Sequence, residues 1–150
     1  MTTLKKQYRP NVSSLINLCE VNYMLLLRLI ADKEHVGEQR SFFISDFLSY
    51  TILITEVTRY TSLITMTQDT RIDGYNLTHL SGPKMVIRLY HDARLAEVIS
   101  NQDIRHIKPR YDYPNNQMHQ PDEKQQINIF LKEWLQLSLQ LGQSAMPSIV

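Results

Sequence analysis

The feature that most constrains the fold is a run of strand-like segments between two long helical patterns. Apolar residues recur at helical spacing over residues 12–30 and again after Pro121, up to a natural stop at Gly142. The segments between these patterns alternate in polarity or are rich in β-branched and aromatic residues: 41–45, 49–57, 59–68, 85–91, 94–99 and 103–108. Because strands that follow one another without helical crossovers pair antiparallel, the sequence predicts an α+β fold. We expect an antiparallel sheet of about five to six strands with an N-terminal and a C-terminal long helix packed on one face.

Two hairpins can be aligned from the strand patterns. In the first, a tight turn at residues 58–59 pairs Leu53 with Ile64, Ile54 with Leu63 and Thr55 with Ser62. In the second, a two-residue turn at residues 92–93 pairs Arg88 with Glu97, Leu89 with Ala96 and Tyr90 with Leu95. One face of the second hairpin is then typical of a core: Met85, Ile87, Leu89, Ala96 and Val98. Residues 69–83 are expected to connect the hairpins, with one helical turn near residues 76–80.

Length and composition indicate a single domain over residues 1–150, with an ordered core at about 10–142. With 43% apolar and 21% charged residues, the chain can bury a core without a metal or a disulfide. The lone Cys19 lies on the apolar stripe of the first helix, where a buried, inert thiol is expected. The longest apolar run near the N-terminus, residues 24–27, is far too short for a membrane span, and no signal core is present, so the sequence predicts a cytoplasmic protein.

Candidate functional residues are concentrated between residues 84 and 124. Arginines and tyrosines suit an anion, because a guanidinium fork and hydroxyl donors bind phosphate or carboxylate well. Turn-rich loops beside a sheet also often carry ligand sites. The candidate ligand-binding residues are Arg88, Tyr90, His91, Asp92, Arg110, Tyr111, Asp112, Tyr113 and His119. A structural network remains open as the alternative, in which Arg88 forms a cross-strand ion pair with Glu97 and the other residues tie the last loop to the sheet.

Other chemistries have weaker support. The ligand types His91, Asp92, His119 and Asp122 lack a recognised metal spacing, so neither a metal nor a cofactor is expected. The chain has only four glycines, none of them in a phosphate-cradling motif, and no serine stands in a nucleophile-elbow motif. The short basic run Arg105, His106, Lys108 and Arg110 could contact single-stranded nucleic acid, but a net charge of +1 does not favour it.

Segments along nearly the whole chain resemble one family. TEVTRYTSL, IRLYHDARLAEV, RYDYPNNQMHQPDEKQQIN and FLKEWL, in this order and spacing, are similar to the YqiB-like family of small bacterial proteins, a domain of unknown function. The resemblance implies a bacterial protein with the same single-domain layout, and it brings no activity, cofactor or catalytic residue with it.

Three functional hypotheses follow from these observations. The first is a binding or adaptor module without catalysis, with a protein or a small anionic ligand as its partner. The second is a hydrolase or transferase acting on a phosphorylated small molecule, with Arg88 and Arg110 holding the anion. In that case His91 or His119 would work as an acid/base pair with Asp92 or Asp112. Nucleic-acid binding through the basic run is the third hypothesis.

Overall fold

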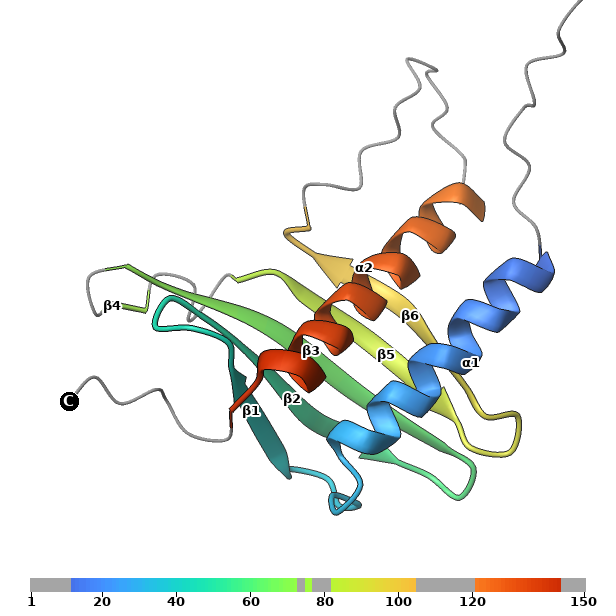
Figure 1. Ribbon diagram of the computed structural model, residues 1–150. Coiled ribbons are helices and arrows are strands. Elements are labelled where there is room, and N and C mark those ends of the chain that lie inside the picture. The colour runs from blue at the N-terminus through green and yellow to red at the C-terminus, as the bar shows by residue number, and fades with distance from the viewer. Residues whose placement is uncertain (1–11, 73–74, 77–81, 105–120, 144–150) are drawn as a thin grey trace, which may run out of the picture.

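The computed structural model describes residues 12–72, 75–76, 82–104 and 121–143 and confirms the α+β class (Figure 1). Both long helices lie on the same face of an antiparallel sheet (Figure 1). The sheet has the strand order β1-β2-β3-β5-β6, and the short β4 pairs with β3 outside this path. The elements are α1 (Val12–Leu29), β1 (Gln39–Phe43), β2 (Leu48–Val57), β3 (Thr61–Ile72), β4 (Tyr75–Asn76), β5 (Lys84–Tyr90), β6 (Leu95–Gln102) and α2 (Pro121–Leu141).

The core lies between the helices and the sheet face that they cover. Along β5 the burial alternates strictly, as expected for a strand with one face packed and one face open. The core face predicted for the second hairpin is confirmed, because Met85, Ile87, Leu89, Ala96 and Val98 are all buried. From the helices, Leu26 and Leu131 are fully buried against this layer. Each side chain of this size contributes about 1.5–3 kcal/mol to folding when it is removed from water.

Helix α2 reaches both edges of the sheet. Near its start, Asn128 Oδ1 accepts a hydrogen bond of 3.1 Å from the backbone N–H of Val98 on the edge strand β6. Just after its end, Gln143 exchanges two backbone hydrogen bonds with Phe43 on the opposite edge strand β1, at 2.9 and 3.0 Å. A Cβ at Gly142 would lie 2.9 Å from that of Phe42 and would clash with the Ser138 carbonyl, so the close approach requires glycine. Both edges of the sheet are thereby partly covered.

Two buried asparagines join the helices to each other and to β6. Asn22 of α1 donates a hydrogen bond of 3.0 Å from Nδ2 to the Asn128 carbonyl, and Asn128 donates one of 2.8 Å from its own Nδ2 to the Lys124 carbonyl. Both side chains are completely buried. Asn22 Oδ1 is also buried and accepts no hydrogen bond within the described part of the chain, which costs stability. The pair therefore fixes how α1, α2 and β6 are arranged more than it adds net stability.

The register predicted for the β2–β3 hairpin is wrong. Leu53 pairs with Thr65 and Ile54 with Ile64, and a β-bulge then shifts the pairing so that Val57 faces Ser62. The connection has a third residue, Tyr60, which the two-residue turn at 58–59 did not include. Two groups of Thr58 close this wider loop: its N–H donates to the Thr61 carbonyl at 2.8 Å, and its Oγ1 contacts Thr61 Oγ1 at 2.6 Å. The alternation of residues along the strands does not reveal a loop that is closed by threonine hydrogen bonds.

The register of the β5–β6 hairpin is confirmed for Arg88 with Glu97, Leu89 with Ala96 and Tyr90 with Leu95. The connection is nevertheless four residues, 91–94, and Arg94 has a positive φ of 57°. The helical turn expected near residues 76–80 is wrong at its first residue, because Asn76 pairs with Arg71 in a strand. The strand expected at 103–108 is wrong at residues 103–104, which lie outside any strand. The rest of both segments lies outside the described residues.

Helix α1 is buried on one side only. Cys19 on that side is 6% exposed, and burial is the main reason why the pKa of its thiol rises to about 11, as expected for an inert cysteine. By length and composition alone, α1 could also cross a membrane, with a mean hydropathy of 1.2. Core helices of soluble proteins and N-terminal signal sequences pass the same test, so length and hydropathy do not assign α1 to a membrane.

Replacing Asn128 tests the link between α2 and the edge of the sheet. Asn128→Ala leaves the buried N–H of Val98 without an acceptor, so we expect the free energy of unfolding in urea to fall by about 1–3 kcal/mol. The matched control is Gln136→Ala on the exposed side of α2, which we expect to change stability by less than about 0.5 kcal/mol. Equal effects of the two substitutions would contradict a structural role for the Asn128 amide.

Candidate functional site

The structure separates the polar residues that the sequence grouped together. Arg88 and Tyr90 lie on the face of β5 opposite the helices, because Leu89 between them packs into the core. His91 turns toward α1, whereas Asp92 is exposed and accepts a hydrogen bond of 2.9 Å from the N–H of Ala93. The other candidates lie outside the described residues: Arg110, Tyr111, Asp112, Tyr113 and His119.

On the open face of the sheet, Glu97 connects two of the neighbouring polar side chains. Tyr90 donates a hydrogen bond of 2.8 Å to Glu97 Oε1, and Lys124 approaches Glu97 Oε2 at 2.6 Å from the start of α2. The expected cross-strand pair is therefore corrected: the ion pair of Glu97 is made with Lys124, while Arg88 acts on it only as a nearby positive charge. Burial alone would raise the pKa of the Glu97 carboxyl, but the hydrogen bonds from Lys124 and Tyr90 outweigh it and lower the pKa. Tyr90, Glu97 and Lys124 therefore form one polar network beside Arg88.

His91 lies at the end of the sheet that the C-terminal end of α1 approaches. Its backbone N–H donates to the Tyr60 carbonyl at 2.8 Å, which links the two hairpin connections. Both ring nitrogens are engaged: Nδ1 lies 2.9 Å from the Tyr23 hydroxyl and Nε2 lies 2.7 Å from Ser62 Oγ. The rings of Tyr23 and His91 meet edge to face with their centroids 5.8 Å apart. The imidazole is therefore held in one orientation.

A cavity of about 420 Å³ opens beside this histidine, and we call it the His91 pocket. Its volume falls within the usual range of small-molecule sites. One part of its wall is apolar and comes from α1 and the sheet: Leu27, Ile30, Ile54, Val57, Ile64 and Leu89. The rest is polar or charged and includes Lys33, Glu34, Thr58, Arg59, Ser62 and His91.

The charged side chains of the His91 pocket favour an anion. The lining contains two basic side chains, Lys33 and Arg59, and one carboxylate, Glu34. Outside the lining, Glu38 lies 3.9 Å from Lys33, and hydrogen bonds from the backbone N–H groups of His35 and Glu34 lower the pKa of its carboxyl. The Arg59 guanidinium lies 5.2 Å from the centre of the Tyr60 ring and forms no ion pair with a described residue. Within the described part of the chain, no carboxylate therefore neutralises the Arg59 charge.

Of the polar residues of this site, only His91 was among the candidates; the others were not: Tyr23, Lys33, Glu34, Thr58, Arg59 and Ser62. Part of the signal was present, since His91 continues the core-facing alternation of Met85, Ile87 and Leu89. The partner Ser62 becomes visible only with the correct pairing of β3 and β5, which places it opposite Leu89. Contacts of this kind depend on strand order rather than on local pattern.

Among the residues that the structure describes, no three His, Cys, Asp or Glu side chains come close enough together to hold a metal ion. Of the metal-ligand types noted in the sequence, His119 lies outside these residues. His91 uses both ring nitrogens for neutral partners, so neither is directed at an ion.

Comparison with known proteins identifies relatives without a known activity. The model of a family described as "Protein of unknown function (DUF1249)" matches residues 25–144. An uncharacterized protein, YqiB, from Escherichia coli strain K12 is 44% identical over 142 residues, which cover 95% of this chain and 98% of that protein. The YqiB proteins of strains O6:H1 and O157:H7 show the same identity and coverage. No solved structure matches the chain.

The lowered pKa of Glu97 predicts a pH-dependent contribution to stability. Because the folded-state pKa lies below the ordinary glutamate pKa of 4.5, the contribution is present above that pH and is lost as the pH falls through the folded-state pKa. We expect Glu97→Gln to lower the free energy of unfolding at pH 7 by up to about 1 kcal/mol, since solvent screens this partly exposed pair. The difference from the unmodified protein should shrink toward pH 3.

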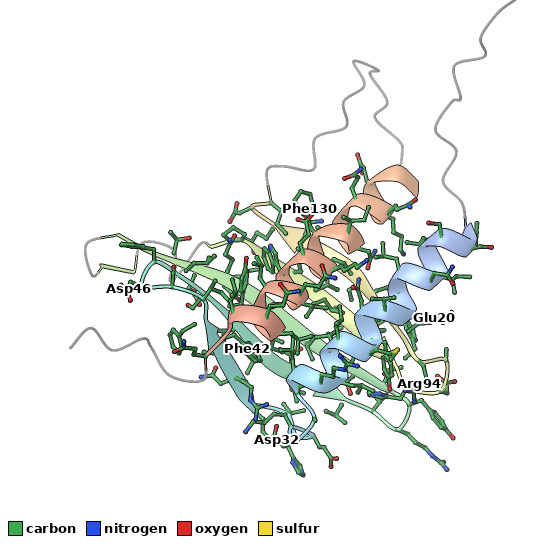
Figure 2. All side chains as sticks on the ribbon, in the orientation of Figure 1. Glu20, Asp32, Phe42, Asp46, Arg94 and Phe130 are labelled. Atoms are coloured by element: carbon green, nitrogen blue, oxygen red, sulfur yellow. The ribbon has the colours of Figure 1, made fainter. Side chains whose placement is uncertain are left out.

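Urea unfolding between pH 7 and pH 3 measures this effect. Glu20→Gln is the control, since Glu20 is an exposed carboxylate on α1 (Figure 2). A difference for Glu97→Gln that stays constant with pH would show that the ionised carboxylate contributes nothing.

Proposed function

This chain belongs to the DUF1249 family of proteins of unknown function, and we propose that it is a non-catalytic module that binds a small amphiphilic anion in the His91 pocket. The ligand class is an aliphatic or aromatic carboxylate with an apolar body. The observation that carries the proposal is a preformed cavity with an apolar wall and two basic side chains in its lining, Lys33 and Arg59.

The apolar wall supplies most of the binding free energy in this proposal. Ile54, Ile64 and Leu89 belong to the sheet, Leu27 belongs to the last turn of α1, and Ile30 follows that helix directly. An apolar body placed against them is removed from water, which contributes about 25 cal/mol for each Å² buried. Since these residues are already held by the core, little ordering is needed on binding.

The polar groups supply the charge preference. Arg59 offers a planar fork that fits a carboxylate, and Lys33, which also lies 3.9 Å from Glu38, is the second basic side chain. His91 and Ser62 lie beside them as hydrogen-bonding groups whose positions are fixed by their contact of 2.7 Å. A ligand with its carboxylate at this polar side and its chain along the apolar wall would use both parts of the lining.

The arrangement of Arg88 supports binding over phosphoryl chemistry. With His91 as its acid/base residue, the hydrolase hypothesis needs Arg88 and His91 in one pocket, but Arg88 lies on the open face of the sheet while His91 faces α1. The form with His119 rests on a residue outside the described part of the chain. Ser62 beside His91 is a nucleophile type, yet the imidazole lacks the carboxylate partner that usually orients it. The nucleic-acid hypothesis rests on Arg105, His106, Lys108 and Arg110, which lie outside the described residues.

Isothermal titration calorimetry with hexanoate tests the proposal. We expect saturable binding of hexanoate and weaker or undetectable binding of hexan-1-ol and hexylammonium, which keep the chain and change the charge. Arg59→Gln and Lys33→Gln should each weaken hexanoate binding by about three- to fivefold, because an exposed ion pair contributes up to about 1 kcal/mol.

Arg28→Gln is the matched control, since Arg28 is an exposed arginine of the last turn of α1 outside the pocket lining. It should leave hexanoate affinity unchanged. The proposal fails if hexanoate and hexan-1-ol bind equally well, or if Arg28→Gln weakens binding as much as Arg59→Gln does. Turnover of p-nitrophenyl phosphate that is lost in His91→Gln would instead support the hydrolase hypothesis.

A further inference from the structure

A second cavity, of about 310 Å³, lies at the opposite ends of the strands from the His91 pocket. We call it the Trp134 pocket. It opens along the side of α2 that faces away from α1, where Phe130 is seen in Figure 2. The two cavities share no lining residue, since this one is built on α2 and the other on the end of α1.

Aromatic rings form much of the wall of the Trp134 pocket. Trp134 and Phe130 come from α2 and Tyr50 from β2. The rings of Tyr50 and Trp134 lie 5.0 Å apart at an interplanar angle of 40° and support each other. Tyr50 and Trp134 are both buried, so their positions are fixed by the core. Such rings present a negative quadrupole, which attracts cations.

The two charged side chains that line this cavity within the described part of the chain are both acidic. Asp103 and Glu133 are exposed residues of the lining; among the described residues the lining holds no lysine, arginine or histidine, and neither carboxylate forms an ion pair with them. The negative charge of Glu133 also acts on the buried Tyr50. Burial raises the pKa of the Tyr50 hydroxyl to about 12, with a further contribution from the negative charge of Glu133, against the opposing effect of the Gln68 hydrogen bond. The cavity therefore combines an aromatic wall with two acidic side chains.

We propose that the Trp134 pocket binds a small organic cation of the quaternary-ammonium class as a free molecule. Methylated ammonium groups are weakly hydrated and gain from aromatic rings, while Asp103 and Glu133 supply the opposite charge. Gln68 also lines the cavity, and its amide contacts the Tyr50 hydroxyl at 3.4 Å. It could form a hydrogen bond with a polar group elsewhere in such a ligand. The Trp134 pocket and the His91 pocket are separate sites, because the first would select a cation and the second an anion.

The chain provides its own reporter for this site. Trp134 is the single tryptophan of the sequence and lines the cavity, so its fluorescence should respond to a bound ligand. We expect choline to change the emission saturably. Its neutral analogue of the same shape, 3,3-dimethylbutan-1-ol, should bind about tenfold more weakly, because it lacks the charge.

Two variants make the test specific. Glu133→Gln removes one charge at nearly constant shape, and we expect it to weaken choline binding by about fivefold while leaving 3,3-dimethylbutan-1-ol unaffected. Glu20→Gln removes an exposed carboxylate on the other helix and should leave both affinities unchanged.

Three results would overturn the proposal. An equal response to choline and 3,3-dimethylbutan-1-ol would show a merely apolar cavity. No saturable response to choline would show that no such site exists. If N-acetyl-trimethyllysine amide binds more than about tenfold tighter than choline, the ligand is a methylated side chain of a protein partner and not a free molecule.

Discussion

The structure depends on how α2 is fastened to the sheet. Asn128 holds the edge strand β6 through the N–H of Val98, and Gln143 pairs with Phe43 on the other edge strand, β1. At the helical rise per residue, Asn128 and Gln143 are about 22 Å apart. Four inter-strand spacings separate the two edges by about 19 Å. The match means that α2 crosses all the strands of the main sheet, and Asn22 then places α1 alongside it.

Two helices placed in this way leave part of the sheet face uncovered at each end of the strands. The His91 pocket forms where α1 ends, and the Trp134 pocket forms along the side of α2 away from α1. Their floors are core residues such as Ile64 and Tyr50, which are rigid because the sheet and helices already hold them. The charges differ because Lys33 and Arg59 line the first and Asp103 and Glu133 line the second. One packing arrangement therefore yields two candidate sites of opposite charge preference.

Sequence patterns predicted those features that depend on neighbouring residues. The alternation from Met85 to Leu89 gave the buried face of β5. The turn placed at residues 92–93 gave the register of β5 with β6 as far as Ile87, where a β-bulge shifts the pairing. The β2–β3 register failed because Thr58 closes a wider loop and a bulge absorbs the difference. At the candidate site, His91 was identified, but its contacts with Tyr23 and Ser62 join α1, β3 and the end of β5. Local periodicity carries no information on such contacts, because they are set by strand order and helix placement.

Amide hydrogen exchange at Val98 tests the fastening of α2 most directly. An edge-strand N–H that points away from the sheet exchanges rapidly if only water covers it. Because Asn128 accepts this N–H, Val98 should exchange as slowly as Ile87 in the interior strand β5, close to the rate set by global unfolding. Rapid exchange at Val98 beside a protected Ile87 would contradict the account, since α2 would then rest on the sheet without holding its edge.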